Sequence, residues 1–308
     1  MNRRDLLQMS AALGIGTSIP GATLATTGGT GAQALAASGQ SKQAVTPLPV
    51  PPDGNIPVAF LISEDAVLID FIGPWEVFDN VRVSGSTPYP FRKYTVAESL
   101  GPVRAGGGMI ITPQYTLATA PAPKVVVIPA QKPPTDAVLA WIRKAAQTAD
   151  LTMSVCTGAY LLAQTGLLSG KEATTHHSAY KDFAMTFPDI RLERGARFVD
   201  LGNLASAGGL SSGIDLALHV VQRYFGTDVA SATADELEYQ GQGWLDPNSN
   251  SVYAQRRVST DAHPLCAVCD MDVDKASAPR SIYHGKTYYF CANSHKALFD
   301  SNPAPFVS

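Results

Sequence analysis

The 308-residue sequence lacks an excess of charge of either sign, since 23 basic and 26 acidic side chains give a net charge of −3. No basic run stands out, so nothing favours nucleic acid or an anionic membrane as a partner. Long apolar runs are also missing. The stretch at 9–19 is too short and too rich in glycine, serine and threonine to span a bilayer, and we expect no stable membrane insertion.

Cysteine is scarce, with four residues in the whole chain. Cys156 stands alone, whereas Cys266, Cys269 and Cys291 lie close together near the C-terminus. This distribution argues against a fold held together by disulfides. It predicts one reactive or buried thiol and one metal site.

The N-terminus has the features of an export signal. Paired arginines at 3–4 precede the apolar stretch, and Ala-x-Ala patterns follow within 32–36. The pair resembles a twin-arginine signal, which implies a periplasmic or otherwise exported protein. We therefore predict a signal peptide at 1–36 and a Pro-rich linker at 37–55; the alternative is a disordered, weakly basic tail.

Residues 56–226 alternate between strand and helix patterns. Short apolar runs predict buried strands, and 3- and 4-residue spacing of apolar positions predicts helices. Such alternation predicts an α/β fold, a three-layer sandwich around a mostly parallel sheet that binds ligands at the carboxyl ends of its strands. The expected strands are 58–62, 93–97, 125–128, 151–155, 172–175, 197–200 and 203–206, and the expected helices are 135–149, 158–165 and 214–224.

Cys156 is the strongest catalytic candidate. It follows directly on the strand 151–155, and Gly158 permits a sharp turn into the next helix. At the N-terminus of a helix, the dipole and unpaired N–H groups stabilise a thiolate. The alternative is a small buried hydrophobic residue.

Four segments in this order resemble the ThiJ/PfpI superfamily. They are 67–78 (VLIDFIGPWEVF), 155–159 (VCTGA), 173–176 (ATTH) and 206–215 (SAGGLSSGID). The resemblance implies the class I glutamine amidotransferase-like fold, which is flavodoxin-like, and it suggests a homodimer. It also identifies Cys156 as the functional cysteine.

Two features resemble the isonitrile hydratase-like branch. Thr157 follows the cysteine where the peptidase- and chaperone-like branches carry histidine, and Asp70 begins an Asp-x-x-Gly-Pro run. The resemblance implies that Cys156 attacks the isonitrile carbon to form a thioimidate. Asp70 would act as the acid and base, and Thr157 would orient the intermediate or the water.

Purely structural roles are the alternatives for these residues. Asp70 could cap a helix that begins near 73–74, and Thr157 could serve only the start of its own helix. His176 is expected to line the pocket or support the fold rather than to react. Ala130 departs from the glycine that the family usually carries, which affects the backbone N–H groups that face the nucleophile.

A polar connector at 227–260 leads to a different C-terminal segment. Residues 261–308 resemble a YHS domain, a short metal-associated module. Independently, a Cys-x-x-Cys and a Cys-x-x-x-His pattern place three thiolates and one imidazole within reach of zinc or another soft metal. The predicted ligands are Cys266, Cys269, Cys291 and His295. The alternatives are a Cys266–Cys269 disulfide, or cysteines that are merely buried.

Two hypotheses of function follow. The first is an exported cysteine-dependent enzyme, an isonitrile hydratase-like lyase or a related hydrolase, that acts on a small-molecule substrate and needs no cofactor in its α/β site. The second is a non-catalytic metal or redox sensor that uses the YHS-like module. In the second, the α/β domain is a ligand-binding or dimer scaffold.

Overall fold

A computed structural model describes residues 46–85 and 87–307. The predicted signal peptide and residues 37–45 of the predicted linker lie outside these residues. No helix in the described ranges has the length and apolar character that a bilayer crossing needs.

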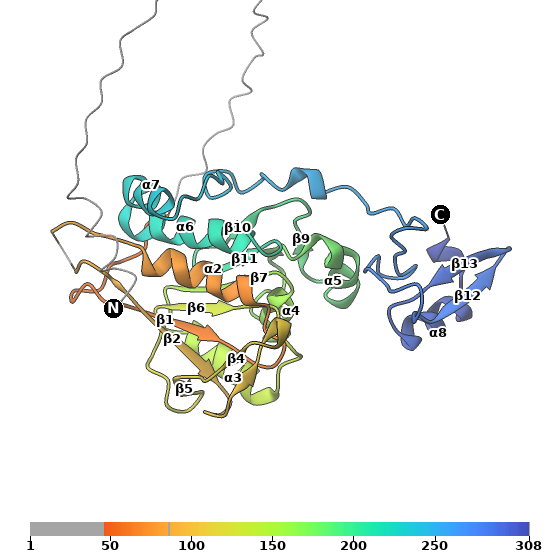
Figure 1. Ribbon diagram of the computed structural model, residues 1–308, viewed down its shortest axis with the longest axis horizontal. Helices are drawn as coiled ribbons and strands as arrows, with labels where there is room; N and C mark the ends of the chain where they lie inside the picture. The colour runs from red at the N-terminus through yellow and green to blue at the C-terminus, as the bar shows by residue number, and fades with distance from the viewer. Residues whose placement is uncertain (1–45, 86, 308) are drawn as a thin grey trace, which may run out of the picture. The chain divides into compact units, whose positions relative to one another are not determined.

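The fold is built on a seven-stranded sheet, in which every neighbouring pair is parallel except β10 with β11 (Figure 1). This arrangement confirms the predicted α/β fold class. From one edge to the other, the strands are β10 (Phe198–Asp200), β11 (Leu204–Ala207), β7 (Leu151–Val155), β6 (Val125–Ile128), β1 (Ile56–Leu61), β2 (Phe91–Ala97) and β5 (Tyr115–Thr116).

Helices cover both faces of this sheet (Figure 1). Strand β6 shows why, because Val125 and Val127 join one apolar core while Val126 and Ile128 join the other. The first core includes α2 (Leu68–Asp79), α6 (Ser212–Phe225) and α7 (Thr227–Glu236). The second includes α3 (Asp136–Ala146), α4 (Gly158–Gln164) and α5 (Tyr180–Thr186).

Smaller elements complete the domain. Residues 172–175 were predicted as a strand, and the prediction is confirmed for two of them, which form β8 and pair with β9 outside the central sheet. An apolar run in the sequence does not show how many of its residues pair with a neighbouring strand, and here only two do. The short pairs are β3 (Val103–Arg104) with β4 (Ile110–Ile111), and β8 (Glu172–Ala173) with β9 (Arg191–Leu192).

The C-terminal segment has its own small core beneath a two-stranded hairpin. The hairpin consists of β12 (Arg280–Tyr283) and β13 (Lys286–Tyr289), and α8 (Asn293–Ser301) follows it. Its fully buried side chains are only Cys266, Val268, Cys269, Phe290 and Phe299. Two of these five are predicted metal ligands, so little apolar surface is left to stabilise the segment.

The order of the strands determines where a site can form. The chain adds β2 on one side of β1 and then β6, β7 and β11 on the other, which puts the switch point between β1 and β6. The loops that leave the carboxyl ends of β1, β6, β7 and β11 therefore meet at one edge of the sheet.

Candidate active site

Cys156 occupies a strained turn directly after β7. Its backbone φ is +58°, a left-handed conformation that costs energy for a residue with a side chain. Its N–H points to the carbonyl oxygens of Ala207 (3.2 Å) and Gly208 (2.9 Å), and its own carbonyl accepts a 2.9 Å bond from the Thr175 hydroxyl. These bonds from neighbouring loops hold the turn in place.

Gly158 lets the elbow pack closely against β6. A Cβ atom at this position would lie 2.2 Å from the carbonyl oxygen of Ile128 and 2.8 Å from the Pro129 carbonyl group. Both contacts are with backbone, which cannot move aside as a side chain can. Glycine is therefore required here by close approach rather than by an unusual dihedral angle.

Asp70 lies in the first turn of α2 and is fully buried. The alternative role, capping a helix that begins near 73–74, is wrong, because the helix begins at Leu68 and its N-cap position is Val67. The carboxyl group instead accepts a 3.1 Å bond through Oδ2 from the N–H of Ala130, in the loop after β6. Within the described residues, Oδ1 is buried without a hydrogen-bond partner.

The Asp70 carboxyl and the Cys156 thiol influence each other's ionisation. Burial raises the pKa of Asp70 from 3.8 to about 7, opposed by the Ala130 N–H and by the thiol. Burial and, to a lesser extent, the Asp70 charge raise the pKa of Cys156 to about 12. The preformed thiolate expected from the helix terminus is thus disfavoured, because α4 has only seven residues and burial outweighs its dipole.

Backbone donors face the sulfur from two loops. Three groups interact with the Cys156 sulfur and lower its pKa, which favours the thiolate. They are the N–H groups of Thr157 and Leu210 and the side chain of Thr157. Thr157 makes no side-chain capping bond, so its hydroxyl serves the sulfur rather than the helix start. Leu210 was missed at the sequence level, since its donor is a backbone group that no side-chain pattern reveals.

The histidines lie beside the site or away from it. The ring of His176 packs against Gly209, next to Leu210, and bonds Ser178 Oγ through Nδ1 at 2.7 Å. Burial lowers the pKa of His176 to about 4, so the ring is neutral at pH 7. His177 stacks on it, with ring centroids 4.4 Å apart. A neutral, partly buried ring of this kind suits a structural role rather than proton transfer.

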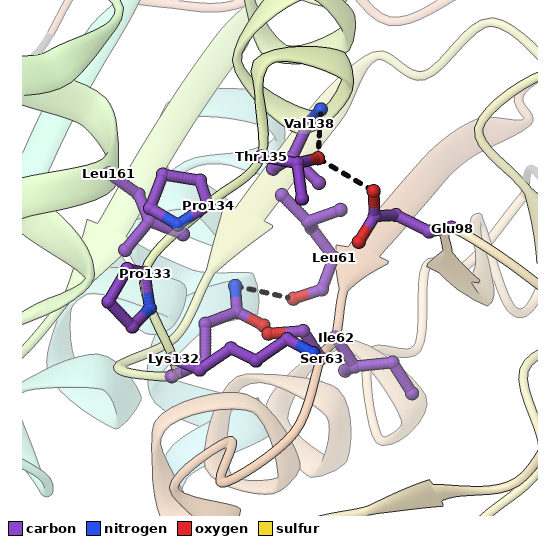
Figure 2. Close-up of a pocket in the computed structure, with 11 residues that line it drawn as sticks. Leu61, Ile62, Ser63, Glu98, Lys132, Pro133, Pro134, Thr135, Val138 and Leu161 are labelled. Atoms are coloured by element: carbon purple, nitrogen blue, oxygen red, sulfur yellow. Dashed lines mark hydrogen bonds between the residues drawn. The ribbon is translucent and has the colours of Figure 1, made fainter.

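A separate small cavity lies where the loop after β6 passes the end of β1. In Figure 2, the hydroxyl of Thr135 bridges the N–H of Val138 and the carboxylate of Glu98. The cavity encloses about 10 Å³, which is room for about one water molecule. Neither Cys156 nor Asp70 lines it, so it lies apart from that pair.

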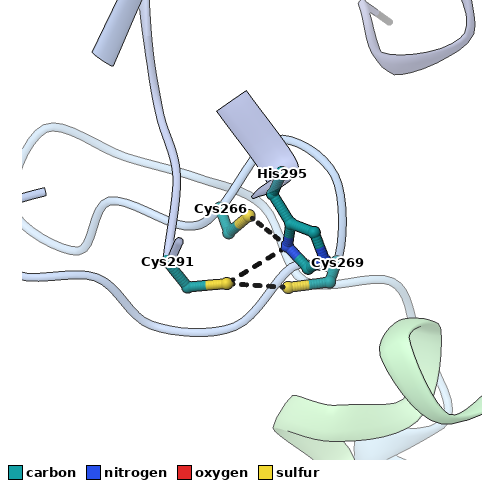
Figure 3. A group of neighbouring side chains, drawn as sticks. All are labelled: Cys266, Cys269, Cys291 and His295. Atoms are coloured by element: carbon teal, nitrogen blue, oxygen red, sulfur yellow. Dashed lines mark hydrogen bonds between the residues drawn. The ribbon is translucent and has the colours of Figure 1, made fainter. Parts of the chain in front are cut away.

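The four predicted metal ligands come together in the C-terminal segment (Figure 3). Their donor atoms all lie within 4.8 Å of one another. Cys266 Sγ and Cys291 Sγ are 3.5 Å and 3.2 Å from His295 Nδ1, and the sulfurs of Cys269 and Cys291 are 3.6 Å apart. All four cysteines of the chain are free thiols, so the alternative Cys266–Cys269 disulfide is absent.

These distances can be compared with a tetrahedral zinc site. Bonds of about 2.3 Å to sulfur and about 2.0 Å to nitrogen place two sulfurs about 3.8 Å apart and a sulfur about 3.5 Å from a nitrogen. The observed separations lie close to these values. The turn is also ordered by backbone bonds, since Cys266 N–H donates to Met271 O and Asp270 N–H to Cys266 O. These three separations suit a tetrahedral ion, and the remaining ones are within 4.8 Å.

Comparisons with known proteins agree with the geometry of the α/β domain. The sequence profile of the DJ-1/PfpI family matches residues 57–223, which include Asp70, Cys156 and Leu210. The chain belongs to the DJ-1/PfpI family. This membership confirms the resemblance to the ThiJ/PfpI superfamily that the motifs indicated.

Relatives within the DJ-1/PfpI family differ in their roles. An isonitrile hydratase of Pseudomonas putida is 34% identical over 187 residues, which cover 59% of this chain and 78% of that protein. The transcriptional regulator GbdR of Pseudomonas aeruginosa is 26% identical and aligns over 62% of this chain but only 53% of its own length. The comparisons therefore support a cysteine-enzyme relationship without deciding between enzyme and regulator.

Solved structures of the DJ-1/PfpI family give the same fold. A ThiJ/PfpI family protein from Pseudomonas syringae is 26% identical, with a TM-score of 0.53 over 68% of this chain and 85% of that one. DJ-1beta of Drosophila melanogaster has the same TM-score over 61% of this chain at 17% identity, which shows the fold alone.

Proposed function

We propose that the protein is a cysteine-dependent enzyme that hydrates isonitriles to N-substituted formamides. The observation that carries the proposal is the buried pair of Asp70 and Cys156: a carboxyl group with a pKa of about 7 beside a thiol, with two backbone donors facing the sulfur. A carboxyl that titrates near neutral pH can both accept and return a proton. The isonitrile hydratase relative supports the choice of substrate.

The reaction divides into two steps. As the sulfur of Cys156 bonds to the terminal isonitrile carbon, Asp70 takes the thiol proton and delivers it to that carbon, which gives a thioimidate. Water then adds to the same carbon, and Asp70 takes one proton from the water and passes it to the nitrogen. The carbon–sulfur bond breaks, the remaining hydroxyl proton passes to the sulfur, and the N-substituted formamide leaves. One water is consumed, and there is no net change in oxidation state.

The Thr157 and Leu210 N–H groups stabilise the sulfur whenever it carries negative charge. Because the resting thiol has a raised pKa, the sulfur is ionised only as its proton moves to Asp70. The strained backbone of Cys156 keeps the sulfur in the turn rather than in the sheet. These features suit attack on a neutral, electrophilic carbon.

Turnover of a simple isonitrile tests this proposal. Purified protein incubated with cyclohexyl isonitrile is expected to form N-cyclohexylformamide, detected by gas chromatography with mass spectrometry. Cys156→Ala is expected to abolish formation above the uncatalysed rate, with thermal melting as the control for folding. Undiminished turnover in Cys156→Ala would contradict the assignment of Cys156 as the nucleophile. The absence of turnover by the wild type would contradict the proposed reaction.

A metal-binding role for the C-terminal segment is a second proposal, favoured by the Cys3His cluster. Cys266, Cys269, Cys291 and His295 would hold a zinc ion, whose chemistry in such a closed site is structural. Protein purified under reducing conditions is expected to contain one zinc per chain by elemental analysis. His295→Ala should lose it, whereas Ser294→Ala, at the exposed neighbouring position, should keep it. Equal metal content in the two variants would contradict the assignment.

Metal or redox sensing without catalysis remains the alternative function of the chain. Two observations support this alternative: the resemblance of the C-terminal segment to a YHS domain, and the regulators among the relatives of the α/β domain. It predicts bound metal together with no turnover of any isonitrile. The affinity of the α/β domain for its ligand would then be unchanged by Cys156→Ala.

Export by the twin-arginine route and a homodimeric state are also proposed. Replacement of Arg3 and Arg4 by lysine is expected to retain the full-length precursor in the cytoplasm, as measured by cell fractionation. Fractionation that is unchanged by the replacement would contradict the route.

Sedimentation equilibrium of the mature protein tests the dimer, and a monomeric mass would contradict it.

A further inference from the structure

The chain returns to the Cys156 site after the family region has ended. The family profile ends at residue 223, and α7 follows it. Residues 239–254 then pack back onto the α/β domain through several separate contacts. Tyr239 donates its hydroxyl to Asp215 Oδ2 at 2.9 Å, and the carbonyl of Pro247 accepts a 2.6 Å bond from the N–H of Arg197. Trp244 is buried in the same stretch.

Arg197 connects this stretch to the loop after β11. Its guanidinium donates through Nε to Asp215 Oδ2 at 2.6 Å, through Nη2 to Ser211 Oγ at 3.0 Å and through Nη1 to Asn250 Oδ1 at 3.1 Å. Asp215 is fully buried, and Asn250 is 7% exposed. A planar cation with three fixed partners restricts all three, because moving any of them leaves a buried polar group without its bond.

Asn250 lies against the turn that serves the nucleophile, residues 208–212. Its Nδ2 donates to Ser212 Oγ at 3.3 Å, and a Cβ on Gly208 would lie 2.9 Å from the same nitrogen. The carbonyl of Gly208 accepts a bond from the N–H of Cys156. Within this turn, Leu210 has a left-handed backbone (φ +51°), which needs support from its surroundings.

We infer that Asn250 is a positioning residue for the Cys156 site. It braces the 208–212 turn through Arg197 and Ser212, so that the Leu210 N–H stays directed at the sulfur. The residue comes from outside the family-matching region, so the stretch 239–254 is part of the active-site structure and not only a link to the C-terminal segment. The catalytic consequence rests on the proposed function, whereas the effect on the thiol does not.

Alkylation of Cys156 tests this inference without any substrate. Iodoacetamide is added at pH 7 to 9, and the modified Cys156 peptide is quantified by mass spectrometry, which separates it from the other three cysteines. Asn250→Ala is expected to slow alkylation about fivefold at each pH, because losing one N–H donor lowers the thiolate fraction. Ser212→Ala breaks the same contact from the other side and is expected to act in the same direction.

Asn248→Ala is the matched control. Asn248 lies two residues away in the same stretch and is exposed, so its replacement is expected to leave the alkylation rate within about twofold of the wild type. If isonitrile turnover is present, Asn250→Ala is also expected to lower kcat about tenfold with KM changed less than about twofold, as for a misdirected oxyanion donor. Loss of packing alone would lower the melting temperature without lowering kcat more strongly than it changes KM.

The outcomes are distinct. If Asn250→Ala does not fold, Ser212→Ala carries the test. An alkylation rate equal to or above that of the wild type in the folded variant would overturn the positioning role, whatever the enzyme does with isonitriles. Slowed alkylation without any isonitrile turnover would support the positioning role and reject only the proposed reaction.

Discussion

The backbone N–H of Ala130 donates to Oδ2 of Asp70 over 3.1 Å, across the switch point between β1 and β6. This bond occupies one carboxyl oxygen and leaves Oδ1 as the oxygen that can carry a proton. It also gives the position of Ala130 a role. The departure from the usual family glycine does not remove the backbone donor, because alanine has the same N–H group.

Asp70→Asn should change two rates in opposite directions. Alkylation of Cys156 at pH 8 should become faster, because the charge that raises the thiol pKa is gone. Isonitrile hydration should fall about 10²- to 10⁴-fold, because no group remains to transfer protons. Parallel alkylation and formamide assays measure both rates. The exposed Asp136, in the first turn of α3, provides the control Asp136→Asn. A decrease in both rates would point to damage of the site rather than to loss of an acid and base.

The raised pKa of Asp70 should make stability depend on pH. Between pH 3.8 and about 7 the folded state keeps the proton that the unfolded chain releases, so the free energy of unfolding falls as pH rises through this window. The full effect, reached above pH 7, is on the order of 4 kcal/mol.

Urea unfolding at pH 5 and pH 8 measures this effect. The wild type should lose more stability between the two values than Asp70→Asn, in which the titrating group is absent. Asp136→Asn should follow the wild type, since its carboxylate is exposed. Equal pH dependence in the wild type and Asp70→Asn would mean that Asp70 titrates at its ordinary pKa.

Gly158→Ala should destabilise the α/β domain severely. The added methyl group would meet the Ile128 carbonyl oxygen at 2.2 Å, and β6 and the elbow would have to separate. We expect a loss of about 3 kcal/mol or more, measured by urea unfolding. Gly101→Ala is the control, because its methyl group would meet only the Ser99 hydroxyl at 3.4 Å. Comparable stability of the two variants would show that the elbow is not closely packed.

Metal removal should unfold the C-terminal segment before the α/β domain. Among the described residues, its core cluster holds only five buried side chains, and a structural zinc contributes about 10–16 kcal/mol of binding energy in zinc-finger peptides. Limited proteolysis with and without a strong chelator, under reducing conditions, measures the effect. Cleavage should appear first within residues 258–308. Resistance to cleavage in the chelated, metal-free protein would show that the segment folds without an ion.

The sequence alone determined much of this protein, because local patterns carry the information. Apolar runs located β6 and β7 to the residue, since buried parallel strands are continuously apolar. The strand, turn and helix predicted around Cys156 are present, with the cysteine in the turn between β7 and α4. The spacing of Cys266, Cys269, Cys291 and His295 identified a cluster that the fold brings within 4.8 Å.

Only the tertiary structure decided what lies around these residues. The ionisation of Cys156 depends on burial and on Asp70, which is 86 positions earlier in the sequence, and both disfavour the thiolate expected from the helix terminus. The donors from Ala130 and Leu210 are backbone groups, and their side chains give no sign of that role. Asn250 reaches the 208–212 turn because the chain folds back after α7. Long-range contacts of this kind follow from packing, which no local pattern encodes.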